Sequence, residues 1–245
     1  MLDKINGFID IHNHILPGID DGAQTIEDAL NLIDAARKDG TRVIVFTPHY
    51  REPYKKNTSE YLKMVFNEFK KILDSRYRDM EFYLGSEVHY EMAVPELLHS
   101  HEVMTYNDTH YALIEFRYKS AKSEILNALR EVKRFGFTPV IAHLERYEIC
   151  VNDKDIIDDI LDQGALIQIN ADSVMGKQGF RIKHFCHKLL KEELVDFIAS
   201  DAHNMDHRPP MLNECYKRVA KKYGEEYADL VFRDNAIRML KGQRI

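Results

Sequence analysis

The sequence of 245 residues contains no tryptophan and only three cysteines, Cys150, Cys186 and Cys215, none of them in a Cys-x-x-Cys pair. Thiols this sparse indicate neither a disulfide framework nor a thiolate zinc site. An uninterrupted apolar run of about 18 residues, as a membrane-spanning helix needs, is missing as well. The N-terminus has no apolar signal-peptide region. These absences predict a cytoplasmic protein with reduced thiols that does not span a membrane.

Two phosphate-handling motifs are also missing. A phosphatase that uses a cysteine nucleophile needs arginine six residues further on, but those three positions hold Ile156, Glu192 and Lys221. A Gly-x-x-x-x-Gly-Lys-Ser/Thr loop, the signature of nucleotide-binding P-loops, does not occur. The net charge of −6 gives no general attraction for nucleic acid or for an anionic membrane. Cysteine-based chemistry and polyanion binding are therefore not expected.

What the chain does contain is a regular alternation of short apolar runs with longer segments of helical period. This alternation is typical of βα units around a parallel sheet, and α/β barrels commonly have about 200 to 250 residues. No linker or repeat divides the chain, so we predict one domain over residues 1–245. Seven strands are predicted, at Phe8–Ile11, Val43–Thr47, Glu81–Gly85, Tyr111–Glu115, Pro139–Ala142, Ala165–Ile169 and Val195–Ala199.

Helices are predicted between these strands. The clearest are Thr25–Lys38, where Thr25 and Asp28 form a capping-box pattern before the stop at Gly40, and Ser59–Leu73, whose apolar residues share one face. These segments support the βα pattern.

Six of the seven predicted strands end at residues of the types that bind metals. The carboxyl ends of parallel strands converge on one rim, where α/β proteins build their sites. We therefore expect these side chains to meet in one cup. They are His12, His14, His49, Glu87, Glu115, His143, Asp201 and His203.

A single histidine at a strand end is usually a capping or surface residue. His12 and His14 are more informative, because alternate residues of an extended chain face the same side and can share an ion. Glu115 lies in an apolar strand, where a carboxylate is rarely buried without a partner. The remaining histidines in polar surroundings are interpreted as structural or surface residues: His99, His101, His110, His184 and His187.

Eight candidate donors exceed the four ligands of a single tetrahedral zinc site, so more than one ion is expected. Imidazole and carboxylate ligands without thiolate suit Mn, Fe or Zn. Clustered cations of this kind are typical of metal-assisted hydrolysis.

In order, the segments DIHNHILPGIDDG, TPHY, GSEVHY, LIEF, AHLERY and SDAHN, the last followed by RPP, resemble those of the polymerase-and-histidinol-phosphatase (PHP) superfamily. Within it, the chain is most similar to the bacterial manganese-dependent protein-tyrosine phosphatases encoded beside capsule and exopolysaccharide genes. The resemblance spans about residues 8 to 210. It implies a distorted TIM-like (β/α)7 barrel with three divalent metal ions, expected to be Mn²⁺, with Fe or Zn as alternatives.

The resemblance also implies roles for individual residues. His12, His14, Glu87 and Asp201 would hold one ion, and Glu87 would bridge to a second ion held with Glu115 and His143. A third ion would be bound by the two remaining histidines of the set, His49 and His203, with Asp21. Arg146 and Arg208 match arginines that contact phosphate, although a surface ion pair is the alternative interpretation of each. His89 matches no ligand of the family.

The implied partner is a phosphotyrosine-bearing protein, namely the tyrosine-rich tail of a kinase that controls polysaccharide assembly. Arg51, Lys55 and Lys56 in the segment HYREPYKKN could attract an acidic peptide, or they could belong to an ordinary solvated loop. Two alternatives stay open. One is a phosphatase of histidinol phosphate or another small phosphomonoester, and the other is a regulatory domain that uses the metals only for stability.

Overall fold

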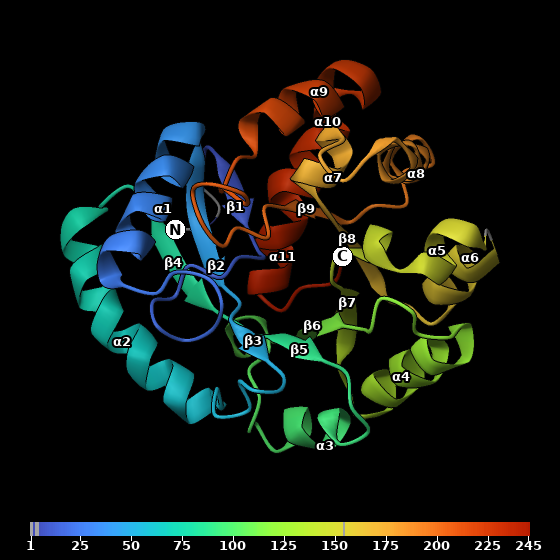
Figure 1. The fold of residues 1–245 in the computed structure, drawn as a ribbon, viewed down its shortest axis with the longest axis horizontal. Helices are drawn as coiled ribbons and strands as arrows, with labels where there is room; N and C mark the ends of the chain where they lie inside the picture. Colours follow the sequence, from blue (N-terminus) through green and yellow to red (C-terminus); the bar gives the residue numbers. More distant parts are fainter. Residues whose placement is uncertain (1, 3–4, 154) are drawn as a thin grey trace.

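The computed structural model describes residues 2, 5–153 and 155–245. Over this range the chain is an α/β protein, with strands in the middle and helices outside (Figure 1). Every pair of neighbouring described strands is parallel. The predicted alternation of strands and helices is confirmed. In the described residues, no helix combines the length and the apolar character that crossing a membrane requires. The assignment of one domain to residues 1–245 stays a prediction.

The described strands form two hydrogen-bonded sheets, ordered β1-β2-β4 and β3-β5-β6-β7-β8-β9. Their bounds are β1 Phe8–Asp10, β2 Thr41–Phe46, β3 His49–Tyr50, β4 Glu81–Leu84, β5 Glu87–His89, β6 Tyr111–Glu115, β7 Thr138–Ile141, β8 Leu166–Asn170 and β9 Phe197–Ala199.

The two short strands β3 and β5 were not predicted. Each continues a predicted strand after a two-residue interruption, so that β2 pairs with β4 and β3 pairs with β5. Pro48 interrupts the first because it has no N–H to donate to a neighbouring strand. Gly85 interrupts the second, where a Cβ would lie 3.3 Å from the ring of Tyr106. The predicted seven strands are thus present, two of them broken close to their carboxyl ends.

The first and last strands meet at their carboxyl ends. Asn13 and Ala202 form a parallel bridge, the N–H of Asp201 donates to the carbonyl of His12 at 2.8 Å, and the N–H of His14 donates to the carbonyl of Ala202 at 2.8 Å. These bonds join the two sheets into one curled surface. The predicted fold class, an α/β distorted barrel, is confirmed.

Helix α1 (Ile26–Asp39) follows the predicted capping pattern. The Oγ1 of Thr25 accepts from the N–H of Asp28, the Asp28 carboxylate accepts from the N–H of Thr25, and Gly40 ends the helix at a φ of 111°. Helix α2 (Ser59–Arg76) buries Leu62, Phe69 and Leu73 against the sheet side and leaves charged residues outside.

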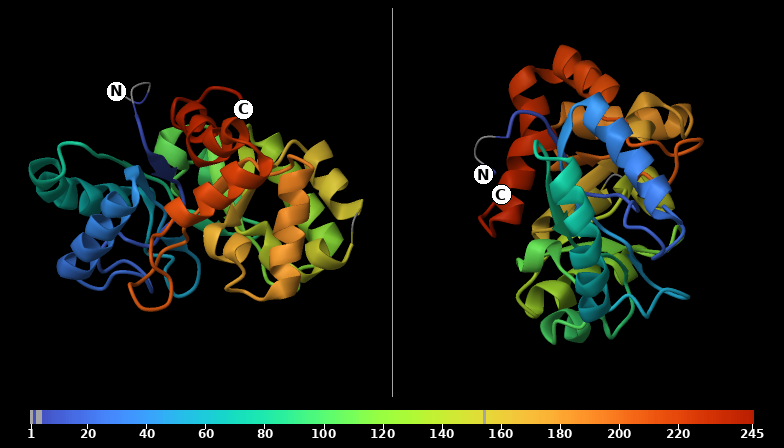
Figure 2. Two further views of the ribbon diagram at one scale, coloured as in Figure 1. Left: turned by 90° about the horizontal axis from the view of Figure 1, so that it is seen from above. Right: turned by 90° about the vertical axis from the view of Figure 1, so that its left-hand side faces the viewer.

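The other helices cover the rest of the strands, and the last three pack together at one side of the molecule (Figure 2). Their bounds are α3 Val94–His99, α4 Lys122–Arg134, α5 Glu148–Asn152, α6 Asp155–Asp162, α7 Ala171–Met175, α8 Phe180–Lys191, α9 Asn213–Tyr223, α10 Glu225–Asp229 and α11 Asn235–Leu240.

The interior of the barrel is apolar below the rim. Ile9, Val43, Leu113, Val140 and Phe197, from five different strands, belong to one fully buried cluster. Full burial of such a side chain contributes about 1.5 to 3 kcal/mol. This packed floor fixes the strand ends, and thereby the side chains on the rim above it.

Candidate metal centre

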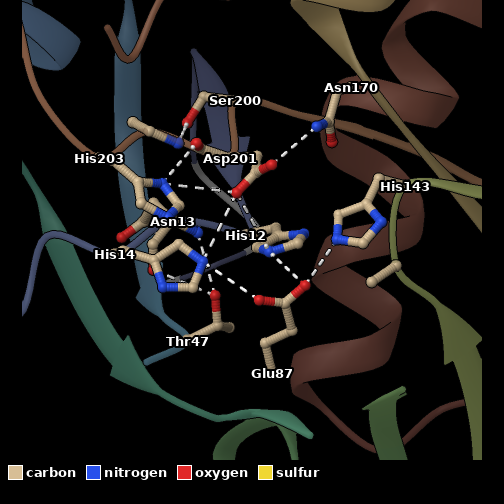
Figure 3. A network of polar contacts seen from close by, with 12 residues as sticks. His12, Asn13, His14, Thr47, Glu87, His143, Asn170, Ser200, Asp201 and His203 are labelled. Carbon is tan, nitrogen blue, oxygen red and sulfur yellow. Dashed lines mark hydrogen bonds and ion pairs between the residues drawn. The ribbon is translucent and has the colours of Figure 1, made fainter. Parts of the chain in front are cut away.

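His12 and His14 follow β1 directly and point into the barrel mouth (Figure 3). Both side chains are fully buried, and their ring centroids lie 5.5 Å apart. Extended backbone places residues 12 and 14 on the same side, as the His-x-His pattern predicted. Two imidazoles thus enter the same enclosed space.

Glu87 lies at the centre of the cluster. Its Oε1 is 3.3 Å from Nε2 of His12 and 2.7 Å from Nε2 of His143. Its Oε2 is 3.3 Å from Nε2 of His14 and 2.8 Å from Nδ1 of His49. One carboxylate therefore contacts four imidazoles from three different strand ends.

Three further carboxylates complete the cluster. Oδ1 of Asp201 lies 3.6 Å from Nε2 of His12, and Oε1 of Glu115 lies 3.8 Å from Nε2 of His143. Oδ1 of Asp21 is 3.4 Å from Nε2 of His49 and 3.8 Å from Nε2 of His203. The structure thus brings together all nine residues predicted as ligands: His12, His14, Asp21, His49, Glu87, Glu115, His143, Asp201 and His203.

The donor atoms fit a set of divalent ions. Four groups of these residues have ligand atoms within 4.8 Å of one another: His14, Asp21, His49 and His203; His12, His14 and Glu87; His12, His143 and Asp201; and His49, Glu87 and Glu115.

Several of the same atoms are buried without a hydrogen-bond partner among the described residues, including Nε2 of His12, His14 and His203 and Oε2 of Glu87. Buried polar groups without partners are costly. Coordination of a cation would satisfy them.

The electrostatics keep the central carboxylates ionised. Burial alone favours the neutral acid, but the imidazoles of His12 and His49 hold the pKa of Glu87 well below its usual range. Burial opposes ionisation of Asp201 too, but Arg146 and His12 hold its pKa well below the ordinary value. Ionised carboxylates are the form that binds a cation.

Two buried residues that the sequence analysis did not select hold the ligands in place. Oε1 of Gln168 lies 3.0 Å from Nδ1 of His12 and accepts from the N–H of His143 at 2.8 Å. Oδ2 of Asp20 lies 2.7 Å from Nδ1 of His14 and accepts from the N–H of His49 at 2.9 Å. Partners of this kind orient metal-binding imidazoles.

A third such residue is Asn170, whose Nδ2 donates to Oδ2 of Asp201 at 2.9 Å. Gln168 and Asn170 lie in β8, in the segment LIQIN. Two amides at alternate positions of an apolar strand were the signal that could have identified them, because they share one face.

Arg146 and Arg208 lie beside the cluster. Nη2 of Arg146 is 2.8 Å from Oδ2 of Asp201, and Nη2 of Arg208 is 2.5 Å from the same oxygen. Both side chains are 30% exposed. Each arginine thus contacts the cluster and keeps part of its side chain exposed, as a group that contacts a bound anion must.

Two more residues reach the rim. Arg51 lies 3.6 Å from Asp21 and 3.5 Å from Glu115, and Nδ1 of His89 lies 3.2 Å from Oε2 of Glu115. Lys55 pairs with Glu52 and Glu91 instead of facing the cluster. The basic segment therefore contributes one arginine to the rim.

The residues interpreted as structural lie elsewhere. None of the five histidines interpreted as structural or surface residues belongs to a metal-type group of the described chain. The three cysteines are buried and unpaired. Burial raises the pKa of the Cys150 thiol to about 12, and burial also raises the pKa of the Cys186 and Cys215 thiols.

Known proteins resemble this chain along nearly its whole length. The model of the family described as capsular polysaccharide synthesis, CpsB/CapC, matches residues 8–241. The tyrosine-protein phosphatase CpsB of Streptococcus agalactiae is 36% identical over 242 residues, covering 97% of this chain and 100% of the relative.

Solved structures agree with this. One is a crystal structure from the work on YwqE of Bacillus subtilis and CpsB of Streptococcus pneumoniae, which are described there as unique metal-dependent tyrosine phosphatases. It superposes on this chain with a TM-score of 0.90 and 31% sequence identity, and the match covers 97% of this chain and 96% of that one. A histidinol phosphate phosphatase from Lactococcus lactis has a TM-score of 0.60 at 15% identity over 89% of this chain and 94% of that one, and therefore shares the fold.

Proposed function

The chain belongs to the capsular polysaccharide synthesis family CpsB/CapC, and we infer from this membership and from its metal-type cluster that it is a metal-dependent protein-tyrosine phosphatase. The single observation that carries the inference is the position of Glu87, in contact with four imidazoles in a buried cup beside two arginines. This geometry suits a cluster of cations next to an anion site.

We propose three divalent ions, with Mn²⁺ as the physiological metal. His12, His14, Glu87 and Asp201 would hold the first, and Glu87, Glu115 and His143 the second; the third would be held by His49, His203 and Asp21. The short distances within these sets support the grouping. When bound, the ions supply positive charge that polarises the phosphoryl group and activates the attacking water.

Arg146 and Arg208 bind and orient the phosphate in this proposal. A guanidinium presents a planar fork that matches two phosphate oxygens, and both forks lie within reach of the ligand Asp201. A phenolate leaving group has a conjugate-acid pKa near 10, so it departs with little help from a general acid. A shallow rim is sufficient for a phosphotyrosine.

The proposed substrate is the tyrosine-rich tail of a kinase that controls polysaccharide assembly, reached in the cytoplasm. The family's description, capsular polysaccharide synthesis, supports this proposal. The shared fold with histidinol phosphate phosphatase does not favour the smaller substrate, because at 15% identity the likeness concerns the fold alone.

One experiment tests the function. The protein is stripped of metal with a chelator, reloaded with Mn²⁺, and assayed on a phosphotyrosine peptide, a phosphoserine peptide and histidinol phosphate. We expect activity only after reloading and a preference for the phosphotyrosine peptide. A kcat/KM for histidinol phosphate about tenfold higher than that for the phosphotyrosine peptide would contradict the assignment. Such a difference corresponds to about 1.4 kcal/mol in transition-state stabilisation. Full activity in the stripped protein would contradict the metal dependence, and no activity after reloading would favour the regulatory alternative.

A further inference from the structure

Helices α8 and α9 flank an open groove with a volume of about 690 Å³. Five cationic side chains line it: Lys183, Lys217, Arg218, Lys221 and Lys222. Glu214 is the one carboxylate in the lining, and His187 lies in it too. The groove is therefore strongly positive although the whole chain carries a net charge of −6.

These five cations are unpaired within the part of the chain that the structure describes, since none of them takes part in an ion pair there. Some surface cations elsewhere are paired, as Arg37 with Asp79 and Lys122 with Asp159. With 40 acidic and 34 basic residues in the chain, carboxylates are not scarce. The lining of this groove nevertheless combines five cations with a single carboxylate, Glu214.

The environment of His187 agrees with an uncompensated positive potential. Its Nδ1 lies 2.7 Å from the Tyr223 hydroxyl, between the two helices. Burial, together with Lys222 and Lys183, lowers the pKa of His187 to about 4. A further positive charge is unfavourable there, whereas an anion is favoured.

The groove continues toward the metal centre. Glu214 and Arg218 also line a neighbouring cavity of about 270 Å³, whose other walls include Ser200 and Arg208. Arg208 in turn contacts Asp201. A chain lying in the groove is therefore next to the cavity that is lined by Arg208, the arginine proposed to bind phosphate.

We propose that the α8–α9 groove binds an acidic stretch of the phosphoprotein substrate. This stretch lies on the side of the phosphotyrosine that faces Arg208. This rests on the tyrosine-phosphatase function proposed above. A concave groove between two helices fits an extended polypeptide better than the plane of a lipid bilayer, and lysines spaced along both walls suit carboxylates at intervals along one chain.

The test uses a triple variant on the exposed side of α9, Lys217→Gln, Lys221→Gln and Lys222→Gln. Its matched control, Lys38→Gln, Lys70→Gln and Lys71→Gln, removes the same charge from α1 and α2, which lie at the far side of the molecule from α8 (Figures 1 and 2). Both are assayed with Mn²⁺ on phosphotyrosine peptides with glutamate-rich and with neutral flanks, and thermal unfolding checks that each variant folds.

For the groove variant, we expect kcat/KM for the glutamate-rich peptide to fall about tenfold, through KM, with less than a twofold change for the neutral peptide. The preference of the wild type for the acidic peptide should also weaken with added salt, and the control variant should behave as the wild type. An equal loss on both peptides, no loss on either, or the same loss in the control variant would overturn the proposal.

A membrane surface is tested separately by sedimentation with phosphatidylglycerol vesicles. If the wild type binds the vesicles, the groove variant does not, and their peptide selectivity is the same, the polypeptide proposal is overturned in favour of a membrane surface. A different result would contradict the proposed function: a wild-type protein that hydrolyses neither peptide is no tyrosine phosphatase. Equal hydrolysis of both peptides by the wild type would refute only the proposal that the groove binds an acidic stretch of the substrate.

Discussion

Arg146 and Arg208 contact the same atom from two different segments of the chain: their Nη2 atoms lie 2.8 and 2.5 Å from Oδ2 of Asp201. Asp201 follows β9, whereas Arg146 lies in the short helix after β7. Two guanidinium groups and a proposed ligand carboxylate are thus linked, so Asp201 connects the proposed metal cluster to the proposed anion site.

This link gives the first prediction. Arg146→Ala should raise the KM for a phosphotyrosine peptide about tenfold or more and leave the metal content unchanged, because Arg146 contacts Asp201 but is not among the proposed ligands. Arg146→Lys should restore binding only in part, since lysine lacks the planar fork. Metal analysis and steady-state kinetics measure both effects, with Glu115→Ala as a contrast that should lose metal. Unchanged kinetic constants in Arg146→Ala would refute the role.

Gln168 provides a second prediction. Its Oε1 contacts both His12 and the backbone of His143, so it fixes the orientation of the His12 ring. Gln168→Leu should weaken Mn²⁺ binding about 10- to 100-fold by isothermal titration calorimetry. Gln168→Glu retains an acceptor oxygen and should bind more tightly than the leucine variant. Equal affinities for the two variants would show that the contact with His12 does not matter.

Gly22 provides a third. A Cβ at this position would lie 1.8 Å from the carbonyl oxygen of His14, so Gly22→Ala must displace the backbone that carries a proposed ligand. We expect lower metal content and a loss of unfolding free energy above about 2 kcal/mol. Gly136→Ala is the control, because it has a φ of +92° but no atom within 4 Å of the new Cβ. It should cost about 1 to 2 kcal/mol and leave the metals bound.

The fourth prediction concerns the thiols. Cys150, Cys186 and Cys215 are at most 1% exposed, and burial raises the pKa of each. Thiols this buried react slowly, and no proposed step uses them. Iodoacetamide should therefore leave activity intact in the native protein. Mass spectrometry of the denatured protein should show labelling of all three. Loss of activity at unchanged metal content would contradict the prediction.

The fifth prediction follows from Asp196, which accepts a hydrogen bond from the N–H of Ile167 at 2.7 Å. Burial raises its pKa from 3.8 to about 6. The carboxyl group is neutral in both states at pH below about 4, but above pH 6 the folded protein carries an unfavourable buried charge, so stability is lost as pH rises through this range.

Asp196→Asn removes that charge and keeps the acceptor oxygen. The unfolding free energy of the variant minus that of the wild type should therefore increase by about 2 kcal/mol between pH 4 and pH 8, as measured by urea denaturation. Parallel pH profiles for the two proteins would refute the assignment.

The strand-end residues could be predicted from the sequence because they combine two local signals. His12, His14 and Glu115 are polar residues at the carboxyl ends of apolar runs, and parallel strands bring such ends together. The breaks at Pro48 and Gly85 were harder to predict, because each depends on how the strand pairs with its neighbouring strand before and after the break.

The supporting residues required the three-dimensional structure. Gln168 contacts residues far away in the sequence, and no local pattern indicates which partner a buried amide has. The backbones of His143 and Asp201 adopt positive φ angles of 35° and 53°, uncommon for residues with a side chain. Such conformations are held by the surrounding fold, so they could not be inferred from residue type.

The closure of the barrel by its own metal-binding segments also orders events during synthesis. The carboxylate of Asp10 accepts hydrogen bonds from the backbone and hydroxyl of Ser200, which is 190 positions later in the chain. A nascent polypeptide that has emerged from the ribosome as far as β8 therefore has most of the proposed ligands but not Asp201 or His203, and its mouth is still open. The proposed metal sites are therefore complete only after Asp201 and His203 have been synthesised and the segment that carries them has paired with the segment after β1.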